Sequence, residues 1–226
     1  MNYFFLTKTM LFRGTNEAEA KSMLNCLGAF TRNYVKGETI YRAGSVVDCI
    51  GVVLCGSVNI AIDDIWGNTS IFSHIDAGEI FAEAYASIPG AALLVNVIAS
   101  EDAEILFLNV AKIMNVCSNS CTHHNQLIKN LLQISAQKNL ELSKRMLHTS
   151  SKSIRRRLLS YFSEQVAQKG SYRFSIPFNR QQLSDYLSVD RSTMCNELSK
   201  MRNDGILTYK KNNFILIEEN INRDKL

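Results

Sequence analysis

One arc of a predicted helix carries side chains of the types that can read the base edges of a nucleic acid. At about 100° of rotation per residue, Arg191, Ser192 and Asn196 share this arc. Arginine pairs bidentately with guanine in the major groove, and asparagine pairs in the same way with adenine. The alternative is a solvated helix face, which has a similar composition. The surrounding elements decide between the two interpretations.

Residues 178–207 predict two short helices joined by a tight turn, the arrangement of a helix-turn-helix. Asn179 is a predicted N-cap, with Gln182 in the capping-box position. Asp190 is placed to cap the second helix, and Gly205 suits its C-terminal end. On the face opposite the polar arc, the second helix has an apolar stripe that can pack on the first helix. This stripe consists of Met194, Leu198 and Met201.

A basic hairpin is predicted after these helices. Two apolar, strand-like runs within residues 206–217 flank the sequence KKNN at 210–213. Lys210 and Lys211 would lie at the tip, where ammonium groups can touch phosphate and so position the protein without reading sequence. The stretch is therefore interpreted as the wing of a winged helix.

The charge of the chain is unevenly distributed. From residue 149 onward there are 14 Lys and Arg against 8 Asp and Glu, whereas the rest of the chain has 11 against 13. A basic C-terminal part beside a slightly acidic N-terminal part is typical of a phosphate-binding module joined to another domain. We therefore expect two domains, 1–148 and 149–226.

Other classes of protein are disfavoured by what the sequence lacks. The apolar run at 2–12 is interrupted by Lys8 and is too short for a membrane span, so we expect a cytoplasmic protein without membrane contact. No Gly-rich phosphate loop, Gly-x-Ser-x-Gly or zinc-protease motif occurs, so no enzyme is expected. Cys117, Cys121 and His124 would share a helix face, but a fourth zinc ligand is not evident and no metal site is predicted.

Within the first 148 residues, the spacing of apolar residues changes from helical to strand-like and back to helical. Residues 1–27 are predicted to be mostly helical, and the short glycine-punctuated apolar pieces between 31 and 108 predict a β-sandwich or roll. A long helix is then expected at about 120–147, with Leu127 and Leu131 packing on the roll. A second stripe recurs at heptad spacing and predicts self-association, unless the helix is buried in its own domain. It consists of Ile128, Leu132, Ser135, Asn139, Leu142 and Met146.

This order resembles the CRP/FNR family of bacterial transcription regulators over essentially the whole chain. The resemblance is carried by KGETIYRAGS at 36–45, IGVVLCGSVNI at 50–60, GEIFAEA at 78–84 and the helix-turn-helix at 180–207. It implies an α+β fold with an N-terminal cyclic-nucleotide-binding-like β-roll (a double-stranded β-helix or jelly roll), a long dimerisation helix and a C-terminal winged helix-turn-helix. It also implies a homodimer on a pseudo-palindromic double-stranded DNA site, with RNA polymerase as a further partner.

The resemblance assigns expected roles to individual positions. Arg191, Ser192 and Asn196 match the family's base-reading positions. Matching positions for contacts to the DNA backbone are Asn179, Arg180, Gln181, Asp190, Thr193, Lys210 and Lys211. Ser192 and Asn196 depart from the Glu and Arg of the cyclic-AMP receptor, so a different target sequence is expected. The long helix is expected to couple the two domains across a hinge at residues 149–153.

The expected effector pocket departs further from the cyclic-AMP-binding pattern. Glu83 is kept, but Leu93 and Leu94 stand where an Arg-Ser pair would hold the cyclic phosphate. Burying a phosphate without a cation is costly, so cyclic AMP is not expected and the effector is unidentified. A pocket around Phe81, Glu83, Tyr85, Leu93 and Leu94 would hold an apolar or weakly polar effector or be filled by side chains. A cyclic-nucleotide-responsive module and a haem or redox sensor of the same fold are the alternatives.

Overall fold

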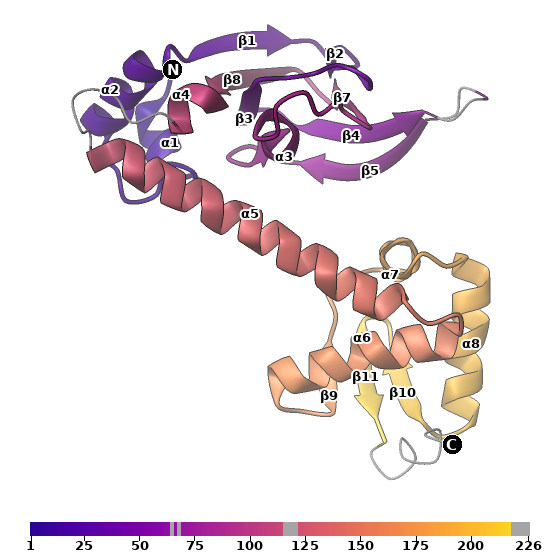
Figure 1. Ribbon diagram of the computed structural model, residues 1–226. Helices are drawn as coiled ribbons and strands as arrows, with labels where there is room; N and C mark the ends of the chain where they lie inside the picture. Colours follow the sequence, from indigo (N-terminus) through magenta and orange to yellow (C-terminus); the bar gives the residue numbers. More distant parts are fainter. Residues whose placement is uncertain (64–65, 67–68, 115–121, 218–226) are drawn as a thin grey trace. The chain divides into compact units, whose positions relative to one another are not determined.

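The protein consists of two compact units, Met1–Gln137 and Lys138–Leu226. The computed structural model describes residues 1–63, 66, 69–114 and 122–217 (Figure 1). The long helix α5, Thr122–Thr149, was expected at about 120–147 and contributes its last three or so turns to the second unit. The domain boundary expected at residue 149 lies at the C-terminal end of this helix.

The first unit is built around two four-stranded antiparallel sheets. Their strand orders are β1-β8-β3-β6 and β2-β7-β4-β5, which confirms the expected roll. The strands are β1 (Phe30–Tyr34), β2 (Thr39–Tyr41), β3 (Cys49–Cys55), β4 (Val58–Asp63), β5 (Thr69–Ile75), β6 (Ile80–Phe81), β7 (Asn96–Ala99) and β8 (Ala103–Asn109). The helices are α1 (Tyr3–Lys8), α2 (Glu17–Leu27), α3 (Glu83–Ala86), α4 (Val110–Met114) and the first part of α5.

Strands β3 and β8 are buried on both faces, which explains their nearly continuous apolar sequences. Because successive side chains of a strand point to opposite faces, Val53 and Ile105 enter the roll interior while Val52 and Leu106 face the helical layer. The helical layer comprises α1, α2, α4 and part of α5. This central position makes β3 and β8 the shared wall of two hydrophobic cores.

The predicted packing stripe of α5 is confirmed within the first unit. Leu127 is fully buried and Leu131 is 6% exposed, and both belong to the core formed with the helical layer and β3. On the same helix, Asn130 donates its side-chain amide to the carbonyls of Leu11 and Arg13, each at 2.8 Å. The amide thus satisfies two carbonyl groups of the connection between α1 and α2, and fixes the connection to α5.

The second unit is a winged helix-turn-helix. Its further elements are α6 (Ile154–Lys169), β9 (Arg173–Ser175), α7 (Arg180–Leu187), α8 (Arg191–Asn203), β10 (Leu207–Lys210) and β11 (Asn213–Leu216). The predicted hairpin of β10 and β11 is present, and β9 pairs with β11 to make a three-stranded sheet. Phe162, Phe174 and Phe214 pack together in the core of this unit.

Among the described residues, none of the helices has the length and apolar composition needed to cross a bilayer.

We predict that position 51 requires glycine, because the aromatic ring of Phe81 lies directly against its backbone. A Cβ atom at this position would come within 2.1 Å of Phe81 Cζ, and the backbone of Gly51 does not have a positive φ. We expect Gly51→Ala to lower the free energy of unfolding by about 1–3 kcal/mol, because the buried ring must move. Chemical denaturation of the full chain measures this loss. The double variant Gly51→Ala/Phe81→Leu should recover part of it; equal stability of Gly51→Ala and the unaltered protein would contradict the prediction.

Candidate nucleic-acid interface

Helix α7 begins with the capping box that the sequence predicts. The side chain of Asn179 accepts a hydrogen bond from the backbone amide of Gln182 at 2.9 Å. The side chain of Gln182 accepts one from the backbone amide of Asn179, also at 2.9 Å. These reciprocal bonds satisfy two of the free amides at the helix start. The Asn179 side chain, expected to contact the DNA backbone, is therefore already engaged in holding its own helix.

The turn between α7 and α8 is fixed by Ser188 and Asp190. Ser188 adopts the left-handed conformation with φ 53° at the end of α7. Asp190 accepts hydrogen bonds from the Thr193 amide (2.8 Å), the Thr193 hydroxyl (2.8 Å) and the Ser192 hydroxyl (2.6 Å). These three donors, led by Ser192, lower the pKa of Asp190 to about 2, so its carboxylate stays charged at the positive end of α8.

Helix α8 presents the predicted polar face. Its apolar stripe of Met194, Leu198 and Met201 is completely buried, as expected. Arg191, Ser192 and Asn196 are exposed on the other side, together at the N-terminal half of the helix. Since the Ser192 hydroxyl proton is directed to Asp190, its oxygen is left to accept from a base amino group.

Arg155 of α6 holds α8 in place through two carboxylates, a role that the sequence pattern does not indicate. Its guanidinium lies 2.6 Å from Glu197 and 2.6 Å from Asp204, at the middle and the end of α8. The hydrogen bond to Glu197 is the main cause of the raised pKa of Arg155. Helix α8 is thereby tied to α6 at its middle and at its C-terminal end.

Arg180 links α7 to the wing. Its guanidinium lies 5.0 Å from the ring centres of Tyr209 and Phe214 and donates to the carbonyl oxygen of Lys211 at 2.9 Å. Lys211 occupies the left-handed region with φ 54° at the hairpin turn. Arg180, expected to contact phosphate, thus has an evident internal role. Lys210 and Lys211 are exposed at the tip, where the sequence places them.

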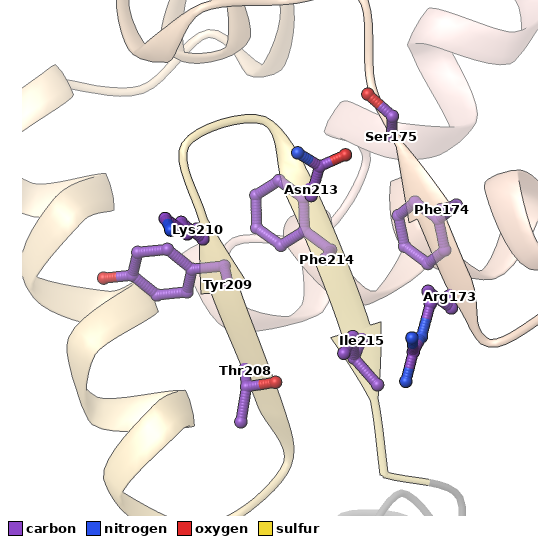
Figure 2. Close-up of a pocket in the computed structure, with 9 residues that line it drawn as sticks. All are labelled: Arg173, Phe174, Ser175, Thr208, Tyr209, Lys210, Asn213, Phe214 and Ile215. Atoms are coloured by element: carbon purple, nitrogen blue, oxygen red, sulfur yellow. The ribbon is translucent and has the colours of Figure 1, made fainter.

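The wing sheet also has an open groove on its surface (Figure 2). Arg173 from β9 and Lys210 from β10 supply its positively charged groups, and Ser175 and Asn213 supply neutral polar ones. The remaining lining residues are Phe174, Thr208, Tyr209, Phe214 and Ile215. The groove belongs to the wing and not to the roll, so it is distinct from the expected effector pocket.

The residues of the expected effector pocket lie in different environments. Phe81 and Leu93 are each 2% exposed, and Glu83 is 9% exposed. Tyr85 is half-buried beside them in sequence, whereas Leu94 is 77% exposed. The adjacent leucines therefore cannot both line an enclosed site in this conformation.

The segment expected to hold a cyclic phosphate does not fit one. No Lys or Arg occurs from Glu83 to Ala99, so this segment offers no cation for the phosphate. The interior is occupied by side chains: the Tyr41 ring packs edge-on against Phe81 (6.0 Å) and Phe107 (5.8 Å). Burial also raises the pKa of the Tyr41 hydroxyl, which donates to the Cys49 carbonyl. The lack of a cation at residues 83–99 and the aromatic packing both disagree with a buried cyclic phosphate.

Of the residues considered as zinc ligands, Cys117 and Cys121 lie outside the described residues. Among the described residues, no three His, Cys, Asp or Glu side chains gather in a way that could hold a metal ion.

Two sequence families match the two parts of the chain. The cyclic nucleotide-binding domain matches residues 31–120, and the Crp-like helix-turn-helix domain matches residues 155–220. With the fold and the exposed face of α8, these matches define a DNA-binding transcription regulator with an effector-binding type of domain. The chain belongs to the CRP/FNR family. A comparison with curated proteins finds no match.

Solved structures share the fold over most of the chain. The catabolite activator protein of Thermus thermophilus is 18% identical, with a TM-score of 0.51, covering 96% of this chain and 97% of that one. The c-di-GMP responsive regulator CLP of Xanthomonas campestris is 14% identical, with a TM-score of 0.56 and coverages of 89% and 99%. CprK complexed with OCPA is 15% identical, with a TM-score of 0.57 and coverages of 87% and 91%. At these identities the likeness establishes the fold alone.

We predict that Arg180 stabilises the winged domain in the absence of DNA. Arg180→Ala removes two cation–π contacts and a hydrogen bond to the wing turn, and should lower the free energy of unfolding by about 1–3 kcal/mol. Arg180→Lys keeps the charge but not the planar guanidinium, so it should restore only part of the loss. Denaturation of the DNA-free full chain measures the effect, with the exposed neighbour Gln181→Ala as control. Unchanged stability with weaker DNA binding would show that Arg180 contacts a DNA phosphate and does not stabilise the domain.

Proposed function

We propose that the protein is a homodimer that binds a pseudo-palindromic DNA site, with one α8 helix in the major groove of each half-site. The observation that carries this proposal is the exposed Arg191, Ser192 and Asn196 face of α8, opposite a completely buried apolar stripe. Arg191 is assigned to a guanine and Asn196 to an adenine. Two-fold symmetric sites suit two such helices related by a dimer axis.

Contacts to the DNA backbone are assigned to the residues around this face. Lys210 and Lys211 are exposed ammonium groups at the wing tip, and Gln181 is exposed on the first turn of α7. Asn179 and Thr193 lie at the starts of α7 and α8, where backbone amides favour phosphate. Asp190 itself is a capping group, because its negative charge would repel phosphate. Arg180 is placed among the residues that support the wing.

The dimer interface is assigned to the heptad stripe of α5. Leu132, Leu142 and Met146 are 69%, 60% and 67% exposed in the single chain, at positions of the predicted heptad seam. The same face of a second copy would cover these side chains, and the polar Asn139 within the seam would favour one register.

The roll is proposed as the regulatory part, with an effector other than a cyclic nucleotide if one is bound. The lack of a cation at residues 83–99 and the aromatic filling of the interior support this choice. As a regulator of transcription, the protein would act in the cytoplasm together with RNA polymerase. Ligand-linked control requires two states of different DNA affinity.

The base-reading role of Arg191 predicts a loss confined to one base pair. After selection of the preferred site from random duplexes, Arg191→Ala should lose about 1–3 kcal/mol of discrimination at a single position in each half-site, because the bidentate pair is gone. Binding to a set of single-base variants of the site measures this. Lys211→Ala is the matched control and should weaken all duplexes alike. The same uniform loss for Arg191→Ala would show that it touches only phosphate.

The dimer seam predicts that a charge at Leu142 separates the protomers. Leu142→Glu should raise the dimer dissociation constant at least about tenfold, because two apolar side chains lose burial and two carboxylates approach each other. Sedimentation equilibrium or light scattering over a concentration series measures the change. Gln137→Glu adds the same charge on the face of α5 opposite the stripe and should leave the assembly intact. A dimer unaffected by Leu142→Glu would place the interface elsewhere.

A further inference from the structure

Two arginines bind the C-terminal end of α7, the first helix of the helix-turn-helix. Arg145 of α5 donates to the carbonyls of Tyr186 (3.0 Å) and Asp185 (2.9 Å). Arg157 of α6 donates to the carbonyls of Leu187 and Ser188, both at 2.9 Å. The last carbonyls of a helix have no partners within the helix and carry its partial negative charge. The Asp185 carbonyl also accepts from the Ser188 amide at 3.2 Å. The two guanidiniums supply donors to the other three carbonyls and a favourable charge to the whole helix end.

The end of α5 is held to this domain by further contacts around His148, which is 4% exposed. Its Nδ1 lies 2.9 Å from the Tyr186 hydroxyl, and its Nε2 lies 3.2 Å from a Glu164 carboxylate oxygen. Lys144 binds the same carboxylate group at 2.8 Å. Burial lowers the pKa of His148. A neutral ring that donates from Nε2 to Glu164 and accepts at Nδ1 from Tyr186 satisfies all of these groups.

The connection between α5 and α6 is bonded to the same group of residues. Arg157 donates through Nε to the Ser151 carbonyl at 2.6 Å, and the Thr149 hydroxyl donates to the Arg145 carbonyl at 2.8 Å. The hinge expected at residues 149–153 thus lies within a hydrogen-bonded assembly. In this conformation, the last turns of α5 are part of the DNA-binding unit.

We propose that Arg145 and Arg157 are positioning residues for DNA recognition. Ser188, whose carbonyl Arg157 holds, is followed two residues later by Asp190, the N-cap of α8. Arg191, the proposed guanine-reading residue, comes directly after this cap. A shift of the α7 end against α5 and α6 therefore moves the base-reading residues, whereas the wing tip is bonded to the opposite end of α7 through Arg180. This inference rests on the proposed function.

The first test compares specific and non-specific DNA binding by the full chain. Arg145→Ala should weaken binding to the selected site roughly tenfold and leave affinity for random duplex, and its salt dependence, unchanged. Arg145→Lys keeps the charge but lacks the planar guanidinium fork that spans both carbonyls, so it should restore only part of the specific affinity. Arg156→Ala removes a charge from an exposed neighbour on α6 and should not alter the ratio of specific to non-specific affinity. An equal loss on both duplexes for Arg145→Ala, or no loss, would overturn the proposal.

A second measurement needs no DNA and separates this proposal from the proposed function. In Arg145→Ala, hydrogen exchange of the backbone amides of residues 188–193 should quicken, while exchange around Phe174 and Phe214 should not change. Unaltered exchange at 188–193 would refute the positioning role even if specific DNA binding is confirmed. Conversely, a wild-type protein that selects no DNA site would refute the proposed function, and the exchange result would still decide whether Arg145 orders the turn.

Discussion

The partnerless peptide groups at helix ends are the constraint on which the DNA-binding unit depends. Short helices such as α7 have few internal hydrogen bonds, so a large share of their peptide groups lie at an end. The side chains of Asn179 and Gln182 accept hydrogen bonds from backbone amides at the start of α7, and Asp190 does the same at the start of α8. Arg145 and Arg157 donate to backbone carbonyls at the end of α7. The position of the recognition helix follows from these local solutions. Hydrophobic packing of Met194, Leu198 and Met201 then fixes its rotation.

The features that could be predicted from the sequence are those set by nearby residues. The capping box, the Asp190 cap and the buried stripe of α8 depend on spacings of three or four residues, and the hairpin depends on the two apolar runs around its turn. The heptad stripe of α5 likewise predicts a helix close to its observed limits. Strand β9 escapes prediction because only Phe174 of its three residues is buried, which leaves too little alternation to detect.

The roles of several arginines could not be predicted, because their partners are distant in sequence. Arg145 meets the end of α7 about forty residues later, and Arg180 meets Tyr209 and Lys211 in the wing. In the roll, the departure at Leu93 and Leu94 already argued against a cyclic phosphate, but the edge-on packing of Tyr41 against Phe81 depends on how the two sheets face each other. Fold-level resemblance places a pocket there; the packing determines what it can hold.

The internal use of arginine changes the meaning of the positive charge in the C-terminal part. A protein that binds DNA gains entropy by releasing counterions from the phosphates that its basic groups neutralise. Arg155 is paired with two carboxylates, while Arg157 and Arg180 are committed to carbonyls within the domain. The number of counterions released on binding is therefore smaller than the basic residue count suggests. For a given affinity, fewer released counterions mean that a larger share comes from non-electrostatic contacts, and that share depends little on ionic strength.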